Sequence, residues 1–325
     1  MPLESIYSHD ILPSSIIFEG DLASKLNKSK LIEKLEKHLT HADKVFQHGD
    51  AAVILDFMSK VRSFPNLSSF ETFANAIRCV LSAGQSLSSR TSLHVIFDSY
   101  LESSVKGGER TRRAAGIGAI DMANKGPDVP IPRQMDKFWP SPSNKTGLQR
   151  LTRAIAYEQQ SHLPIILSGC IVDDEIVSAE LINQERLSSE SSLPANMDAL
   201  TCSVEEADDR LVLHCAWEVA RGCARLLVIS NDTDTVVRLL RFITGWREHG
   251  LRELWVEFGS DERRRHLPLH ILAERLGLSL CIVLVKVHVL TGDDGLSKIG
   301  TKHAAFTCEP KKYLGNFAER PSPMI

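Results

Sequence analysis

The sequence predicts an α/β fold in which helices flank a mostly parallel, twisted sheet. Short apolar runs alternate along the chain with longer segments in which apolar residues recur at helical spacing. The runs are almost continuously apolar, as in strands that are covered on both faces. The chain has 325 residues, of which 43% are hydrophobic and 24% charged, so it is too apolar for a disordered protein and typical of a globular one.

The chain divides into an N-terminal appendage, one large domain and a short tail. We assign the appendage to residues 1–50, the domain to 51–305 and the tail to 306–325. Within the domain, residues 102–160 are interpreted as a basic, arch-like insertion. Ten Lys and Arg residues stand against five Asp and Glu residues in 102–153, and the Gly and Pro residues in the middle of this stretch indicate a loop.

The individual elements follow from the spacing of apolar residues. In the appendage, Leu31, Leu35 and Leu39 have the spacing of a helix face. The polar stretch 173–197 is typical of a loop, and the apolar segment 278–290 is either a buried helix or a buried strand. We expect strands at 51–55, 93–97, 163–167, 198–202, 225–230, 253–258 and 266–267, and helices over 69–81, 205–221, 232–244 and 268–276.

Composition excludes several classes of protein. The net charge of −3 argues against a uniformly basic nucleic-acid coat. The N-terminal residues lack the basic and apolar regions of a secretory signal, and the most apolar run is shorter than a membrane helix. The seven cysteines are scattered and form no CxxC pair. We therefore expect an intracellular protein of the nucleus or cytoplasm, not secreted and without a membrane partner.

Acidic residues follow the predicted strands repeatedly. Ligand sites of parallel α/β sheets lie beyond the carboxyl ends of the strands, so these acids are expected to converge. Carboxylate oxygens are the ligands that Mg²⁺ prefers, and two such ions stabilise both the attacking and the leaving oxygen of a phosphodiester. The acids are Asp56, Asp98, Glu206, Asp208, Asp232, Asp234 and Asp294.

Each acid also has a purely structural interpretation. Ser203 and Glu206 have the spacing of a capping box at the start of a helix. Asp232 has the position of a helix N-cap, and Asp56 and Asp98 have the position of turn residues. The functional interpretation depends on the set of acids and on their order.

That order resembles the flap-endonuclease/XPG-type nucleases, a branch of the PIN-like fold. This family has an acid after its first strand, then a V-F-D-G motif, an E-x-E/D pair, a D-x-D pair and a G-C-D motif. Here the order is Asp56, Val95–Asp98, Glu206–Asp208, Asp232–Asp234 and Gly292–Asp294. A closer resemblance is to uncharacterised animal PIN-like proteins with the motifs E-E-A-D-T-R, S-x-D-T-D and L-T-G-C-D-T-T-S.

Two further parts of the chain share in the resemblance. The family has a lysine and an arginine-rich helix after its V-F-D motif, which contact the scissile phosphate, and this chain has Lys106, Arg110, Arg112 and Arg113. The family also has a helix–two-turn–helix that binds duplex backbone and a monovalent cation. A short remnant of it is expected at residues 298–304, where the turn contains Gly300, Thr301 and Lys302.

The resemblance implies a nuclease that hydrolyses phosphodiester bonds with two Mg²⁺ or Mn²⁺ ions. The expected partner is nucleic acid, with DNA as the first expectation and RNA as the second, and K⁺ would bind at the 299–302 turn. The first ion would be held by Asp56, Asp98, Glu206 and Asp208, and the second by Asp232, Asp234 and Asp294.

The chain also departs from the family pattern. Phe57 and Ser99 stand where the family has glycine, and Asp293, Gly295 and Leu296 replace the Cys and the two Thr residues of C-D-T-T. Two alternatives therefore stay open. One is a catalytically inactive PIN-like scaffold that binds nucleic acid or protein, and the other is a Rossmann-like hydrolase whose acids do not converge.

Overall fold

The computed structural model describes residues 29–47, 49–63, 70–88, 91–99, 126–159, 163–172, 175–181, 198–259 and 264–290. The chain forms two compact units. The unit that contains the sheet consists of Lys44–Asp232 and Trp246–Pro268. The described helices of the other unit are α2 (Ser29–Glu36), most of α9 (Thr233–Glu248), α10 (Leu269–Leu276) and α11 (Leu278–Leu290).

A seven-stranded, mostly parallel sheet forms the core of the first unit, which makes this an α/β protein of Rossmann-like architecture. The strand order is β4-β3-β2-β1-β5-β6-β7, with only β4 and β7, at the two edges, antiparallel to their neighbours. The strands are β1 (Ala52–Asp56), β2 (Leu93–Ile96), β3 (Ile165–Val172), β4 (Glu175–Leu181), β5 (Arg225–Ile229), β6 (Glu253–Phe258) and β7 (Arg265–Pro268).

The strand order contains a topological switch point between β1 and β5. The chain runs outward from β1 through β2 to β3 on one side and then returns to pair β5 with the other side of β1. Ligands of such sheets bind outside the carboxyl ends of the strands at this point.

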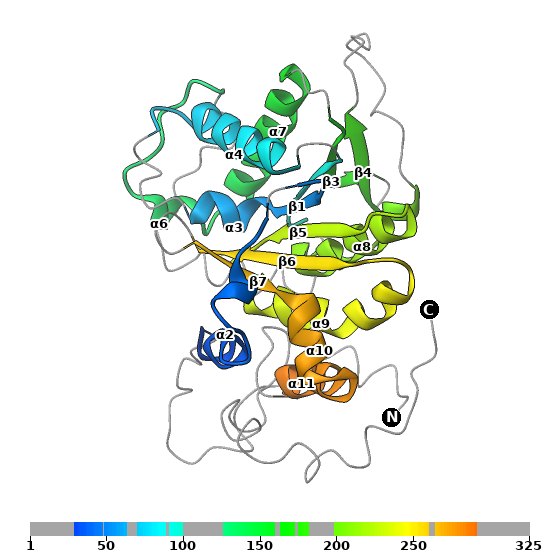
Figure 1. The fold of residues 1–325 in the computed structure, drawn as a ribbon. Coiled ribbons are helices and arrows are strands. Elements are labelled where there is room, and N and C mark those ends of the chain that lie inside the picture. Colours follow the sequence, from blue (N-terminus) through cyan, green and yellow to red (C-terminus); the bar gives the residue numbers. More distant parts are fainter. Residues whose placement is uncertain are drawn as a thin grey trace, which may run out of the picture. The chain divides into compact units, whose positions relative to one another are not determined.

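Helices cover both faces of the sheet (Figure 1). On one face, α3 (Phe57–Arg62), α4 (Phe73–Ser88) and α7 (Pro142–Glu158) pack over a core that includes Val53, Leu55, Val95 and Leu227. On the other face, α8 (Ala207–Ala220) contacts β1 and β2. Successive strand residues point to opposite faces, so almost every residue of these central strands is buried.

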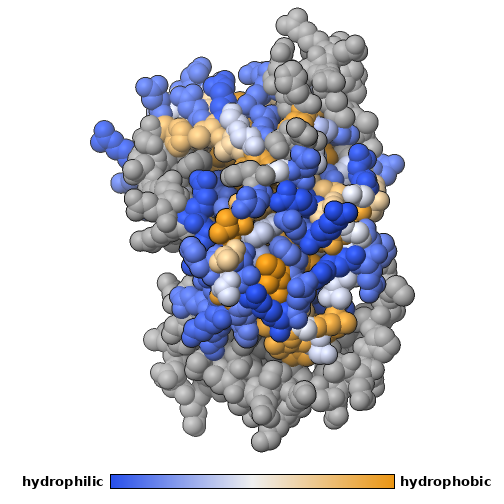
Figure 2. Space-filling model, viewed as in Figure 1, coloured by the Kyte–Doolittle hydropathy of each residue, from blue (hydrophilic) through white to orange (hydrophobic). Residues whose placement is uncertain are grey.

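Hydrophilic residues dominate the face shown in Figure 2, where hydrophobic residues gather in separate patches. Other hydrophobic side chains are buried, such as those of Leu211, Cys215 and Val219, which recur every four residues along the buried side of α8. No helix among the described residues combines the length and the apolar character that crossing a membrane requires.

The structure corrects two predictions about the sheet. Part of the expected loop 173–197 is a strand, β4, which pairs antiparallel with β3. The expected strand 198–202 is instead a short 3-10 helix, η3 (Asp198–Leu200), followed by a single bridge from Cys202 to Ile176. An antiparallel edge strand with polar residues at alternate positions is harder to distinguish from a loop than a fully buried one.

Part of the predicted insertion 102–160 belongs to the core. Helix α7 lies within it, packs against α4 and contributes Leu148, Ile155 and Ala156 to the core. Residues 101–125, which contain the Arg-rich stretch, lie outside the described residues.

The other unit is helical in its described part. Leu31 and Leu35 are buried on one side of α2, as their helical spacing predicts. Arg275 of α10 donates hydrogen bonds to the carbonyl of His38 and, over 2.7 Å, to Oδ2 of Asp43. The hydrogen bond from Arg275 lowers the pKa of Asp43 to about 2.

Candidate functional site

Five of the seven predicted acids lie at the carboxyl edge of the parallel strands in the first unit. Asp56 is the last residue of β1, Asp98 follows the end of β2, and Asp232 follows the end of β5. Glu206 is the N-cap of α8 and Asp208 is the second residue of that helix. All five are partly exposed.

Asp56 lies at the switch point and links β1 to β5. Its Oδ1 accepts a hydrogen bond from the Ser59 amide at 2.9 Å and caps α3. Its Oδ2 accepts a hydrogen bond from Ser230 Oγ at 3.3 Å, and the same hydroxyl accepts one from the Asp232 amide. Asp56 is thus the N-cap of α3, where the structural interpretation predicted a turn residue, and it is also tied to the loop that carries Asp232.

The acids near Asp56 act on its pKa. Burial raises its pKa, the negative charges of Asp98, Asp208 and Asp232 raise it further, and the hydrogen bond from Ser59 lowers it, for a value of about 7. Four carboxyl groups therefore interact in one place. At neutral pH, Asp56 is therefore partly protonated.

Asp98 is held by the start of α8. Its Oδ1 accepts a hydrogen bond from the Ala207 amide at 3.1 Å, and its carbonyl accepts one from Gln149 Nε2. Asp98, which follows the end of β2, thus accepts a hydrogen bond from the first turn of α8. The side chain of Glu206, at the N-cap position, makes no capping hydrogen bond. The predicted capping box of Ser203 and Glu206 is therefore wrong, because the helix begins only at Ala207.

Arg210, to which the sequence analysis assigned no role, lies behind these acids. Its side chain is only 1% exposed, and it donates hydrogen bonds to the carbonyls of Phe97 and Glu205 and to Ser168 Oγ. Burial lowers its pKa to about 10, against the opposing charges of Asp98 and Glu206, so it remains a cation at neutral pH. Arg210 is the last residue of Glu205–Arg210, the stretch that resembles the E-E-A-D-T-R motif, and this position was its signal in the sequence.

The donor set fits a hard divalent cation in its chemistry, since every acid supplies oxygen. Within the described residues, however, no three His, Cys, Asp or Glu side chains are arranged closely enough to hold a metal ion as they stand. Carboxylates that repel one another separate unless a cation lies between them. The site is thus an assembly of acids around Asp56 and not a closed coordination group.

The remaining predicted site residues are not part of this assembly as described. Asp234 is the second residue of α9, belongs to the other unit, and is 3% exposed. Eight residues lie outside the described part of the chain: Lys106, Arg110, Arg112, Arg113, Asp294, Gly300, Thr301 and Lys302.

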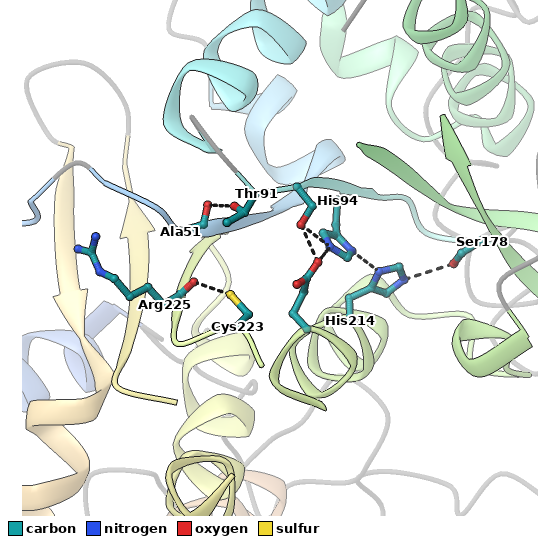
Figure 3. A network of polar contacts seen from close by, with 9 residues as sticks. Ala51, Thr91, His94, Ser178, His214, Cys223 and Arg225 are labelled. Atoms are coloured by element: carbon teal, nitrogen blue, oxygen red, sulfur yellow. Dashed lines mark hydrogen bonds and ion pairs between the residues drawn. The ribbon is translucent and has the colours of Figure 1, made fainter. Parts of the chain in front are cut away.

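A second polar network is buried on the α8 side of the sheet (Figure 3). His94 Nε2 lies 2.7 Å from Glu218 Oε1, and Ser92 Oγ donates a hydrogen bond to the same oxygen. His94 Nδ1 lies 2.8 Å from His214 Nδ1, and His214 Nε2 lies 3.3 Å from Ser178 Oγ. His214 is fully buried.

One proton arrangement satisfies every member of this network. His94 Nε2–H donates to Glu218, His214 Nδ1–H donates to His94, and the Ser178 hydroxyl donates to His214. Burial, His94 and Arg210 lower the pKa of His214 well below its ordinary value, so it is neutral. Burial raises the pKa of Glu218, but the hydrogen bonds from His94 and Ser92 lower it by a larger amount, so the net shift is downward.

A third buried carboxylate, Glu257, lies near the end of β6. Lys60 Nζ contacts its Oε1 at 2.8 Å, Arg264 Nε lies 3.9 Å from that oxygen, and His266 Nε2 lies 3.5 Å from Oε2. Burial raises its pKa, but the contact with His266 and the charges of Lys60 and Arg264 lower it to about 2.

Comparison of this chain with models of known protein families and with curated proteins gives no match.

Proposed function

We propose that this protein is a divalent-metal-dependent nuclease with a PIN-like domain, which hydrolyses phosphodiester bonds of DNA or RNA. The observation that carries the proposal is the electrostatic convergence of Asp98, Asp208 and Asp232 on Asp56 at the switch point of the sheet. Buried carboxylates that face other carboxylates are costly in the free protein, and they become favourable when a cation binds.

The roles of the individual residues follow the motif order. Asp56, Asp98, Glu206 and Asp208 would hold one ion, and Asp232, Asp234 and Asp294 the other. Bound Mg²⁺ or Mn²⁺ would supply an activated water and neutralise charge on the phosphate. Lys106 and Arg110 would orient the phosphate, and Gly300–Lys302 would contact the backbone away from the cut, with K⁺ in that turn.

The raised pKa of Asp56 predicts that cation binding depends on pH. A proton and a cation compete for the same carboxylate oxygens, so cation affinity should fall as the pH drops below about 7. Hydrogen bonds from Ser59 and Ser230 hold the two carboxyl oxygens of Asp56.

The proposal is tested by a cleavage panel of single strands, duplexes, flaps and hairpins, each as DNA and as RNA, with Mg²⁺ or Mn²⁺. Asp232→Asn combined with Asp234→Asn should abolish cleavage while the protein stays folded. Asp209→Asn is the matched control, because Asp209 is an exposed acid next to Asp208 on the same helix. Metal-dependent cleavage by the double variant would contradict the proposal.

The inactive scaffold is a second candidate, and one observation favours it: the described acids form no closed metal-binding group. A melting-temperature series with Mn²⁺ separates the two. Binding to the folded state alone adds about 3 kcal/mol of stability at a hundredfold excess over Kd. A rise that the double variant loses supports the nuclease, whereas an unchanged melting temperature with no cleavage supports the scaffold.

A further inference from the structure

Arg210 is the largest fully buried side chain among the described residues, and it lies between the two loops that carry the acids. Its Nη2 donates hydrogen bonds to the carbonyl of Phe97 and, over 3.2 Å, to that of Glu205. Each carbonyl belongs to the residue immediately before a predicted ligand, Asp98 in one loop and Glu206 in the other. One guanidinium nitrogen therefore bridges the backbone of both loops next to their acids.

Strand β3 makes room for this guanidinium at Gly169. Strand β3 has an irregularity between Ser168 and Cys170, and Gly169 there has φ +103°, a conformation that favours glycine. A Cβ atom on Gly169 would lie 2.9 Å from Arg210 Nη1 and 2.9 Å from the Phe97 carbonyl. The bulge also turns Ser168 Oγ toward Nη1, at 3.2 Å.

The contacts around Arg210 connect the same two loops again. The Ser99 amide donates to the Glu205 carbonyl at 2.9 Å, and the Ala207 amide donates to Asp98 Oδ1 at 3.1 Å. Ser99 Oγ donates to the Gly169 carbonyl at 3.3 Å. The end of β2, the bulge of β3 and the start of α8 thus form one hydrogen-bonded unit with Arg210 at its centre.

We propose that Arg210 is a positioning residue of the acidic site: it fixes Asp98 and Glu206 relative to each other through their preceding carbonyls, and it places a permanent positive charge behind the acids. This role rests on the proposed function. Arginine is required because its planar fork reaches two carbonyls and a hydroxyl at once, whereas a lysine ammonium is a single point. Arg210 touches no substrate in this role and acts through the acids.

The test compares Mn²⁺ binding by the whole chain in the natural protein and in Arg210→Lys, measured by calorimetry well below the melting temperature. We expect Arg210→Lys to weaken Mn²⁺ binding about 10- to 100-fold, the range for residues that hold metal ligands from behind. Glu218→Leu is the control, since it removes a buried polar contact near the other end of α8 and should leave Mn²⁺ affinity unchanged.

A second readout does not depend on metal. In Arg210→Lys the amides of Ser99 and Ala207 should exchange hydrogen faster, while those of β5 and β6 should not. Ser168→Ala, which removes only the acceptor of Nη1, is the milder variant if Arg210→Lys does not fold, and it should change both readouts in the same direction by less.

The outcomes separate the two proposals. Weaker Mn²⁺ binding with faster exchange at Ser99 and Ala207 supports the positioning role. Unchanged affinity and exchange in a folded variant overturn it. If the natural protein binds no Mn²⁺, the proposed function fails, and the exchange rates alone then decide whether Arg210 holds the two loops.

Discussion

Two carboxylates, Asp56 at the end of β1 and Glu218 on α8, have pKa values shifted in opposite directions. The pKa of Asp56 is raised to about 7, whereas that of Glu218 is lowered. Burial acts on both in the same direction, so it does not explain the difference. The neighbours do: Asp56 faces Asp98, Asp208 and Asp232, and Glu218 accepts hydrogen bonds from His94 and Ser92. The fold supplies a partner for one charge and gathers like charges around the other.

Glu257 shows that an acid near the end of a strand is not always surrounded by other acids. It lies near the end of β6, and its carbonyl accepts a hydrogen bond from the Ser230 amide, next to the loop that carries Asp232. Yet Lys60, His266 and Arg264 surround its carboxylate. Glu257 has cationic side chains around its carboxylate, whereas Asp56, at the same edge of the sheet, has other acids, which is the arrangement expected of a cation site.

The largest change in stability should come from removing Lys60, the cation that contacts Glu257. Lys60→Met leaves a carboxylate that is 1% exposed with weaker partners, and breaking such a pair costs about 3 kcal/mol or more. The free energy of unfolding in urea measures the loss. Lys60→Met combined with Glu257→Gln should recover most of it. A loss below about 1 kcal/mol for Lys60→Met would show that Arg264 and His266 suffice.

The same pair should make the protein sensitive to acid. Because the pKa of Glu257 falls from 4.5 to about 2 on folding, its contribution is present above pH 4.5 and is lost as the pH drops toward 2. Lys60→Met should flatten this dependence, since a smaller downward shift of the pKa leaves less stability to lose.

A smaller loss is expected in the network around Glu218. Glu218→Leu leaves the Ser92 hydroxyl and His94 Nε2–H without their common acceptor in the core, at a cost of about 2 kcal/mol. Glu218→Gln keeps a carbonyl oxygen in place and should cost about half as much. Equal losses for the two variants would mean that packing, and not the acceptor, is what this position contributes.

The sequence predicted the parts of the fold that depend on local pattern. Strands β1, β2, β5 and β6 are buried on both faces, so their residues form apolar runs that can be recognised without knowledge of their neighbours. Strand β4 was missed because Glu175, Ser178 and Glu180 interrupt its apolar residues at an edge of the sheet. Its pairing with β3 decides its structure, and a single segment does not reveal a partner.

In the acidic site, too, the sequence predicted what depends on local position and missed what depends on distant residues. Acids at strand ends could be predicted because strand position alone places them at one edge, and the positions of Asp56, Asp98 and Asp232 agree with that expectation. Arg210 could not be predicted, because its burial requires the bulge at Gly169, 41 residues earlier. The His94–His214 contact joins residues 120 apart and exists only because α8 packs on β2.

The smallest effect, and the only one of opposite sign, is expected at Asp56. Asp56→Asn removes a charge from among three others and keeps the oxygen that accepts from Ser59, so α3 remains capped. The metal-free variant should be more stable than the natural protein at pH 8 by about 1–2 kcal/mol, or about 2–4 °C in melting temperature for each kcal/mol. Mn²⁺ should stabilise the natural protein more than the variant, because Asp56 is a ligand of only one of the two proposed ions.

The pH dependence distinguishes this gain from an ordinary packing effect. The pKa of Asp56 rises from 3.8 to about 7 on folding, so the folded state binds a proton more tightly than the unfolded state does. Stability of the metal-free natural protein should therefore fall as the pH rises from about 4 to 7, and this fall should be absent in Asp56→Asn. Calorimetric melting of both proteins between pH 4 and 8 measures it. A gain for the variant that is equal at pH 4 and at pH 8 would contradict the view that repulsion among these acids sets the cost, and with it the reason for placing a cation there.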